Sequence, residues 1–352
     1  MSPVISATVK PLAAMAVAIG LLAIGLAALG ANPAVTLTAL LSGAFGDWLA
    51  VADTLLKATP LVFTGLSVSL AFSGSIWNIG AEGQLLFGAL AATACGIHLA
   101  RWSHVAAISA VLGAGAIAGA LAGALCGWLR TRFSVNEVIS TIMLNFIALQ
   151  AVSWAVHGPL MEPSHSYPIS QKLPAAACMH WFFPPSRLNC GLLLAIGLAP
   201  ACYFWLYRTN SGFELRAVGR NPRATAFFGI AAGPITVVAM ALSGGLAGLG
   251  GAVQVCAITQ RLFERFSPGW GYEAIAVALV ARLNPLAVVP SALFFGALDN
   301  GAQVIQRTQG VSPVLVQAAQ GLIIFVLLAF DTPILARGRS ATLPHHKQPA
   351  DA

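Results

Sequence analysis

Charged residues are scarce in this chain. Only 8% of its 352 residues are Asp, Glu, Lys or Arg, whereas 58% are hydrophobic. A soluble domain carries about 25% charged residues, so the composition excludes an ordinary soluble globule and indicates a polytopic membrane protein. The 35 glycines and 20 prolines fit membrane helices better than soluble ones. We therefore interpret the net charge of +7 through the side of the bilayer on which the arginines lie, and expect no nucleic-acid partner.

Motifs for catalysis and cofactor binding are also absent from the sequence. A P-loop needs a lysine followed by Ser or Thr, but the residues that follow the lysines are Pro11, Ala58, Leu173 and Gln348. The sequence contains no G-x-S-x-G, H-E-x-x-H or G-x-G-x-x-G motif either. We therefore expect a chain that is not an enzyme and that holds no cofactor of its own.

Cysteine and histidine show no pattern of a metal site. The 6 cysteines form no C-x-x-C pair, and the 7 histidines lack metal-ligand spacing, so we expect no bound metal. Cys178 and Cys190 flank the longest polar loop. They would be able to form a disulfide if that loop is exported.

Long apolar runs occupy most of the remaining chain. A helix needs about 20 apolar residues to cross the hydrocarbon core. By this measure the sequence predicts an all-α protein with about ten transmembrane helices, some of them broken or re-entrant. The predicted spans lie near residues 11–31, 58–73, 84–100, 105–129, 136–156, 189–207, 233–256, 272–281, 285–304 and 313–330.

The distribution of arginine predicts the topology. The loop 208–230 carries the densest arginine cluster and is expected to be cytoplasmic. With the N-terminus also inside, the loop 158–188 is external, residues 34–57 form an external connection with a short helix, and the tail 336–352 is cytoplasmic. Residues 1–335 are then expected to form a single transmembrane domain.

The stretch 72–88, FSGSIWNIGAEGQLLFG, interrupts two apolar runs. It combines several glycines with Asn78, Glu82 and Gln84. Unpaired polar groups are costly in hydrocarbon, and non-helical backbone at that depth is tolerated only inside protein or beside a wet cavity. We therefore predict a helix break that faces a pathway. The alternative is a short cytoplasmic turn between two ordinary helices.

A polar seam runs along the predicted span 136–156, NEVISTIMLNFIALQAVSWAV. Glu137, Thr141 and Asn145 recur at helical spacing, which indicates a face turned towards protein or water rather than lipid. The alternative for the first turn is that Asn136 caps the helix and Glu137 complements its dipole.

Glycine recurs at every fourth position in the span 105–129. Gly115, Gly119, Gly123 and Gly127 would form one smooth face on which a neighbouring helix can approach closely.

The cytoplasmic loop 208–230 contains a second candidate site. Asn221-Pro222 is a favourable helix start, because Asn caps and Pro fits the first turn. A short helix would follow, with Phe227 and Phe228 exposed and an end near Gly229. Such a basic, apolar helix would either dock in a groove of a partner or lie on anionic lipid.

Four segments together resemble the permease subunits of bacterial ABC importers. They are WNIGAEGQLLFGA (77–89), NEVISTIMLNFIA (136–148), AVGRNPRATAFFGI (217–230) and GYEAIAVALVARLNPLAVVPSALFFGAL (271–298). The resemblance is to the nucleoside and simple-sugar branch of the ribose and branched-chain amino-acid permease superfamily, and covers about residues 55–330. The chain departs from that branch at Trp77, where phenylalanine is more frequent, and near Arg282, where a small residue is more frequent.

This resemblance implies a type II ABC importer-like permease in the bacterial cytoplasmic membrane, with both termini cytoplasmic. It implies three protein partners: a cytoplasmic ATPase that binds ATP-Mg, a second permease subunit that is identical or homologous, and an extracytoplasmic solute-binding protein. The residues expected to seat in the ATPase are Arg220, Asn221, Pro222, Arg223, Phe227, Phe228 and Gly229. Those expected along the solute pathway are Trp77, Asn78, Glu82, Gln84, Glu137, Thr141 and Asn145.

The solute implied by the resemblance is a purine or pyrimidine nucleoside, on whose base Trp77 would stack. A simple sugar is the alternative, since it would use the same hydrogen-bonding groups. Two other functions stay open at this point. One is a secondary transporter in which Glu82 or Glu137 carries a coupling proton, and the other is a passive channel or membrane scaffold.

Overall fold

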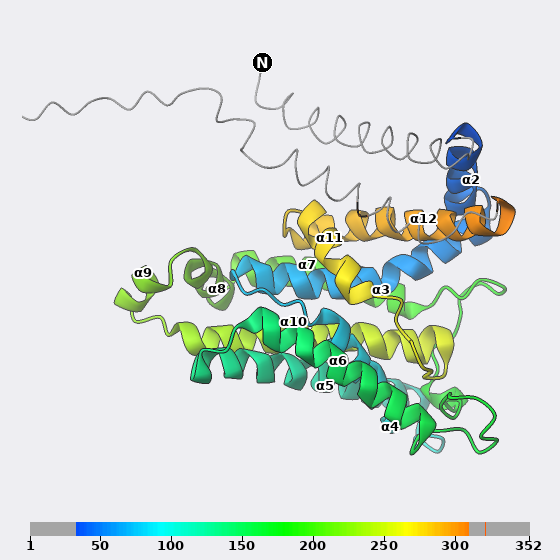
Figure 1. The fold of residues 1–352 in the computed structure, drawn as a ribbon, viewed down its shortest axis with the longest axis horizontal. Helices are drawn as coiled ribbons and strands as arrows, with labels where there is room; N and C mark the ends of the chain where they lie inside the picture. Colours follow the sequence, from blue (N-terminus) through cyan, green and yellow to red (C-terminus); the bar gives the residue numbers. More distant parts are fainter. Residues whose placement is uncertain (1–32, 310–320, 322–352) are drawn as a thin grey trace, which may run out of the picture. The chain divides into compact units, whose positions relative to one another are not determined.

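Apolar helices make up most of the structure in the computed structural model, which describes residues 33–309 and residue 321. Residues 37–309 of this described part belong to one compact unit, Leu37–Pro313. The helices are α2 (Pro33–Phe45), α3 (Trp48–Ser73), α4 (Ala81–Gly96), α5 (His104–Phe133), α6 (Glu137–His157), α7 (Cys190–Arg208), α8 (Asn210–Arg220), α9 (Pro222–Phe227), α10 (Ala232–Val253), α11 (Trp270–Val280) and α12 (Pro285–Gln309), with a short 3₁₀ turn η1 (Ala175–Ala177) and a π-helical turn η2 (Gln254–Thr259) (Figure 1).

The predicted all-α, multi-pass architecture is confirmed. Within residues 33–309 there is no β-strand, only isolated bridges in loops. The predicted spans that fall in this part correspond to α3, α4, α5, α6, α7, α10, α11 and α12. Six of the described helices are long and apolar enough to cross a membrane, whereas α4 and α11 are shorter. The predicted spans 11–31 and 313–330 and the tail 336–352 lie outside the described residues.

Residues 34–57 were predicted to be a connection with a short helix; the structure has the short helix α2 there, but α3 already begins at Trp48 rather than near residue 58. This segment is helical almost throughout, because its polar residues serve as a helix cap and an ion pair. Asp47 accepts a hydrogen bond from Ala50 N at 2.6 Å and so begins α3. Lys57 Nζ forms an ion pair with Asp299 Oδ2 of α12, at 3.1 Å. The charged residues that suggested a connection therefore stabilise α3 through a helix cap and an ion pair.

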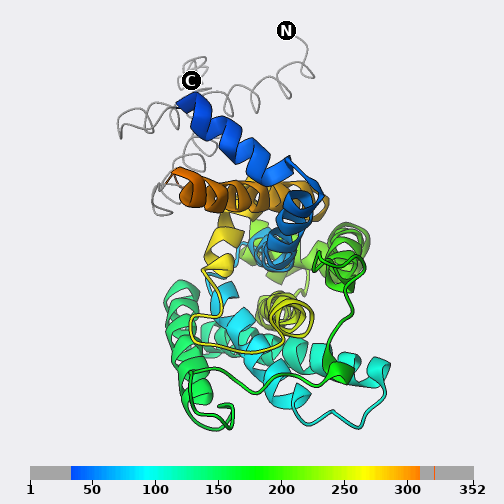
Figure 2. The ribbon, with the colours of Figure 1, turned by 90° about the vertical axis from the view of Figure 1, so that its right-hand side faces the viewer.

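The predicted glycine face of α5 is confirmed as a close helix contact. α10 packs on α3, α4 and α5, and Figure 2 looks along it, with α3 on one side and α4 and α5 on the other. Gly119 faces Gly244 and Gly248 of α10 so closely that an added Cβ would collide with the Gly244 carbonyl oxygen. Gly123 meets the Met240 carbonyl in the same way. Small residues thus allow the two backbones to touch, which is how membrane helices commonly associate.

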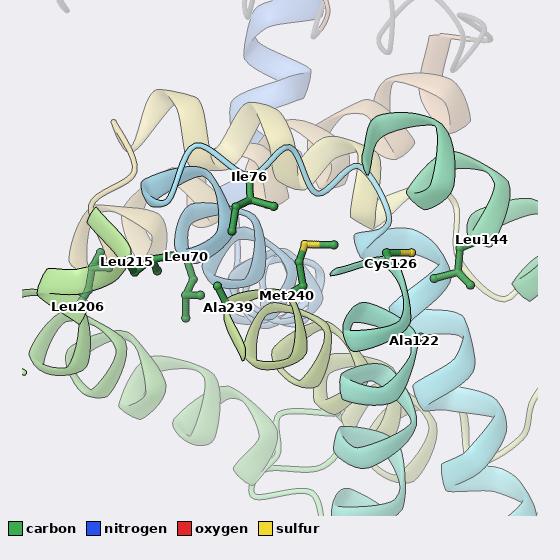
Figure 3. Close-up of a cluster of buried hydrophobic side chains, with 9 residues drawn as sticks. All are labelled: Leu70, Ile76, Ala122, Cys126, Leu144, Leu206, Leu215, Ala239 and Met240. Carbon is green, nitrogen blue, oxygen red and sulfur yellow. The ribbon is translucent and has the colours of Figure 1, made fainter. Parts of the chain in front are cut away.

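A cluster of buried apolar side chains lies beneath the break between α3 and α4. Ile76, in the middle of the break, is 2% exposed and points towards Leu70 and Met240 (Figure 3). Leu215 of α8 and Leu206 of α7 complete this side of the cluster. Burial of the Ile76 side chain therefore contributes to fixing the non-helical segment.

Candidate translocation site and coupling helix

The predicted helix break is present between α3 and α4. α3 ends at Ser73 and α4 begins at Ala81, so residues 74–80 are not helical. Ser75 has a φ of 54°, in the left-handed region that side chains other than glycine seldom adopt. Its hydroxyl donates to the Gly219 carbonyl of α8 at 2.8 Å, which fixes this turn to another element.

The first polar cluster of the break centres on Asn78, which is fully buried. Its Nδ2 donates to Gln84 Oε1 at 2.9 Å and to Ser243 Oγ at 2.8 Å, and its Oδ1 accepts from Gly80 N at 3.0 Å. Ser243, on α10, in turn donates to the Ser67 carbonyl of α3 at 2.7 Å. One chain of hydrogen bonds thus joins α3, the break, α4 and α10.

The second polar cluster centres on Asn145 of α6, which is 3% exposed. Its Oδ1 accepts from Gly83 N at 2.8 Å, and its Nδ2 donates to the Ile79 carbonyl at 2.9 Å. The same amide lies 3.2 Å from the Tyr272 hydroxyl of α11. A single side chain therefore pairs backbone groups on both sides of the α4 start.

Glu82 ties α4 to α11. It is 6% exposed, and its Oε2 accepts from the backbone N–H of Gly271 at 2.7 Å. Gly271 sits so close to the α4 backbone that a Cβ there would collide with Glu82 N. A carboxylate oxygen is thus used to pair an orphan N–H in the first turn of α11.

The other predicted pathway residues have different surroundings. Thr141 is fully buried and donates to the Glu137 carbonyl at 2.7 Å. Glu137 itself lies 2.8 Å from Arg130 at the end of α5, and Asn136 caps α6 by accepting from Val138 N at 2.9 Å. The capping alternative for Asn136 is therefore confirmed.

Trp77 is unlike the rest of the set, because it is 53% exposed. Its ring lies 4.9 Å from that of Phe72, measured between centroids. The structure thus brings Asn78, Glu82, Gln84 and Asn145 together in the interior and leaves Trp77 at the surface of the described residues.

The short helix predicted in the 208–230 loop is also present, as α9. Asn221 Oδ1 accepts from Ala224 N at 3.0 Å, Pro222 occupies the first turn, and Gly229 follows with a φ of 77°. Phe227 and Phe228 are 92% and 84% exposed. Arg220, the last residue of α8, and Arg223, in α9, are also exposed.

α8 connects this helix to the break. Besides accepting from Ser75, α8 places Leu215 and Gly219 against Gly74 with no room for a Cβ on either glycine. α9 follows α8 after one residue, Asn221. The helix that carries the exposed phenylalanines is therefore connected through α8 to the break that carries the buried polar clusters.

Comparison with known proteins decides the family. Residues 50–330 match the family model described as the permease component of branched-chain amino acid transport systems. The chain belongs to this permease family. It is therefore a multi-pass membrane protein of a transport system, and no solved structure matches it.

Curated relatives of the permease cover most of its length. It is 32% identical to the guanosine ABC transporter permease protein NupP of Bacillus subtilis over 82% of this chain and 83% of that one. It is 31% identical to the nucleoside ABC transporter permease protein NupB of Lactococcus lactis, over 90% and 89%. The glucose ABC transporter permease protein TsgB13 of Haloferax volcanii is 30% identical over 79% and 76%.

The loop 158–188 of the permease is tied to the segment after η2. Glu162 pairs with Arg261, and Ser170 N donates to the Leu262 carbonyl at 2.7 Å. Hydrogen bonds from the Ser164 hydroxyl and the Arg261 guanidinium hold the pKa of the Glu162 carboxyl below its ordinary value.

The disulfide that the sequence permitted in this loop is not formed. Cys178 is buried and Cys190 is exposed at the start of α7, and both are free thiols.

Several partners of the polar clusters were missed from the sequence of the permease. Ser67 and Ser243 lie within apolar helices and gave no signal beyond a single hydroxyl. Tyr272 belongs to one of the family-like segments, but nothing in its surroundings indicated that it reaches Asn145. Gln254, buried at the start of η2, was also overlooked, although an amide at the end of a glycine-rich apolar span was a usable signal.

Proposed function

We propose that this permease translocates a small polar solute, most simply a nucleoside, by alternating access driven by a partner ATPase. The names of the Bacillus and Lactococcus relatives support guanosine or another nucleoside. The name of the Haloferax relative supports glucose, which keeps a simple sugar as the second candidate. In this proposal ATP-Mg is bound by the partner, and the chain itself carries no cofactor.

The proposed assembly contains a cytoplasmic ABC ATPase, a second permease subunit that is identical or homologous, and an extracytoplasmic solute-binding protein. It resides in a bacterial cytoplasmic membrane with both termini of this chain cytoplasmic. Membership of the permease family favours this assembly over a proton-coupled carrier or a passive channel.

The observation that carries the ATPase assignment is the exposed aromatic pair of α9. Two adjacent phenylalanines that are 92% and 84% exposed leave a large apolar area without cover from the described residues. A six-residue helix is too short to be stable by itself and gains order from a partner surface. A groove in the ATPase would bury both rings, with Arg220 and Arg223 at its rim.

In this proposal the predicted pathway residues line the solute route, which is closed in this structure. Asn78, Glu82, Gln84 and Asn145 are buried, and their amide and carboxylate groups bond to protein. We infer that these groups exchange protein partners for solute or water when the route opens. Thr141 and Glu137 would border the same route from α6, and Trp77 would stack on a base at its mouth.

The decisive test of ATPase docking is the Phe227→Asp variant. A buried carboxylate without a partner is strongly disfavoured, so we expect the variant to lose co-purification of the ATPase while the chain still inserts in the membrane. Tyr167→Asp is the matched control, because Tyr167 is 68% exposed on the loop 158–188 and should retain the ATPase. Wild-type recovery of the ATPase with Phe227→Asp would reject the docking role.

A second variant distinguishes docking of α9 in the ATPase from binding of α9 to the lipid surface. Phe227→Lys introduces a cation that anionic lipid tolerates or attracts, whereas an apolar protein groove rejects it. Loss of the ATPase with Phe227→Lys therefore supports a groove. Retention of the ATPase by this variant would favour the lipid-surface alternative.

The solute is identified with the purified, assembled transporter. Radiolabelled guanosine and glucose are each supplied with the binding protein, and solute-stimulated ATP hydrolysis and uptake into proteoliposomes are measured. Stimulation by guanosine and not by glucose is the expected result. Stimulation by glucose alone would replace the nucleoside assignment.

A further inference from the structure

A groove runs between α7 and α10. α7 packs chiefly on α3 and α12, whereas α10 packs on α3, α4 and α5, so the two helices leave a seam between them. The groove in this seam has a volume of about 580 Å³, and residues of α5 form its far side. Leu70 of α3 forms its floor and belongs to the apolar cluster beneath the break (Figure 3).

The lining of the groove is apolar. No charged or amide side chain lines it, and its only polar side-chain atoms are the thiol of Cys202 and the indole nitrogen of Trp205. Val238, Leu242 and Ile117 line it and are 52%, 41% and 62% exposed, so the groove is open to the outside of the bundle. α5, α7 and α10 are each long and apolar enough to cross a membrane, which makes that outside hydrocarbon. An apolar groove in such surroundings fits an apolar ligand and does not retain water.

The length of the groove matches one leaflet of a bilayer. It follows α10 from Val238 to Leu249, which are 11 residues apart, or about 16 Å along a helix. Half of the hydrocarbon core of a bilayer measures about 15 Å. The groove therefore has the length of a lipid acyl chain within a single leaflet.

Arg208 lies at the end of the groove that is nearer α9. Ala201 and Trp205 of α7 line the groove, and Arg208 follows them at i+7, on the same face of the helix. Arg208 is exposed, and in the part of the chain that the structure describes its side chain forms no ion pair or hydrogen bond. A guanidinium group binds a phosphate group through two parallel hydrogen bonds. Tryptophan is enriched where the hydrocarbon meets the headgroups, which is the position that Trp205 then occupies.

We propose that the groove between α7 and α10 binds an acyl chain of an anionic phospholipid in the leaflet on the α9 side, and that Arg208 binds the phosphate group of this lipid. The acyl chain covers Leu70 and so stabilises the cluster in which Ile76 of the break is buried. The negative headgroup supplies the counter-charge of Arg208. This inference goes beyond the proposed function, because it does not depend on which solute is transported.

The headgroup contact is tested with the purified full chain in detergent. Phosphatidylglycerol, which is anionic, or phosphatidylcholine, which is zwitterionic, is added, and the affinity is taken from the concentration at which each lipid raises the melting temperature. We expect Arg208→Gln to lower the affinity for phosphatidylglycerol about fivefold, the effect of one cation at an anionic lipid surface, and to leave that for phosphatidylcholine unchanged. Arg101→Gln is the matched control, because Arg101 is exposed between α4 and α5 outside the groove.

The groove itself is tested by filling it. Ala201 is exposed and lines the groove, so Ala201→Phe places a ring in the groove without entering the core of the bundle. We expect this variant to lose most of the stabilisation by either lipid. Leu193→Phe is the control on the same helix, since Leu193 is 61% exposed and does not line the groove, and it should respond to both lipids as the wild type does.

Three results would overturn the proposal. The first is an affinity of Arg208→Gln for phosphatidylglycerol equal to that of the wild type, and the second is an unchanged lipid response of Ala201→Phe. The third is a wild-type oligomer that Ala201→Phe dissociates while its response to lipid is kept, which would show that a second copy of the chain covers the groove. If Ala201→Phe does not fold, the comparison of Arg208→Gln with Arg101→Gln decides alone.

Discussion

Replacing Asn145 by leucine should destabilise the permease, because this amide joins α6, the helix break and α11. The change removes three hydrogen bonds, to Gly83 N, the Ile79 carbonyl and the Tyr272 hydroxyl. Hydrogen bonds between membrane helices average about 0.6 kcal/mol each, which gives about 2 kcal/mol. The two backbone groups are also left buried without a partner, at about 1–3 kcal/mol each if they cannot relax. Relaxation of the segment removes most of this second cost, so we expect a loss of about 3 kcal/mol in the free energy of unfolding.

The assay is the apparent melting temperature of the detergent-solubilised chain. For 352 residues the entropy of unfolding is about 0.7 kcal/mol/K, so a loss of about 3 kcal/mol lowers the melting temperature by roughly 4 °C. Gln150→Leu on the same helix removes an exposed amide and should shift the melting temperature by far less. Equal melting temperatures for the two variants would refute the argument that Asn145 holds the break. A variant of normal stability that fails only in uptake would instead make Asn145 a direct solute contact.

Two further predictions concern the contacts of α5 and α4. Gly119→Ala should lower the melting temperature, since overpacking against Gly244 costs about 1–3 kcal/mol. Gly113→Ala is the control on the same helix; its added Cβ meets open space, so it should raise the melting temperature slightly. A lower melting temperature for Gly113→Ala than for Gly119→Ala would disprove the close contact. Glu82→Gln keeps an oxygen for Gly271 N–H, so ATP-driven uptake should continue in proteoliposomes. Loss of uptake by an assembled Glu82→Gln transporter would give its ionisable carboxyl a part in transport.

The elements that could be predicted from the sequence are those fixed by local chemistry. Asn221 and Pro222 specify the start of α9 within a few residues, and the structure uses both as expected. The start of α3 could not be predicted in this way. Asp53 and Lys57 resemble loop residues locally, and Lys57 is tolerated in a helix because Asp299, 242 residues further on, pairs with it.

The polar character of the break was predictable, but its partners were not. The sequence indicated that Asn78 and Asn145 must avoid lipid, and both are buried in protein. Their partners Ser243 and Tyr272 are 165 and 127 residues away, at distances along the chain where no periodicity or spacing rule applies.

The hydrogen bonds of the break explain how this segment can both persist at membrane depth and change. Gly80 N, the Ile79 carbonyl and Gly83 N are paired by side chains of Asn78 and Asn145 rather than by helical backbone. Such bonds can be exchanged for water or solute without unwinding α3 or α4, because the helices do not depend on them. α8 contacts the same segment through Ser75, so a displacement of α8 reaches the break directly. The contacts therefore form a continuous route from the exposed helix α9, through α8, to the polar groups between α3 and α4.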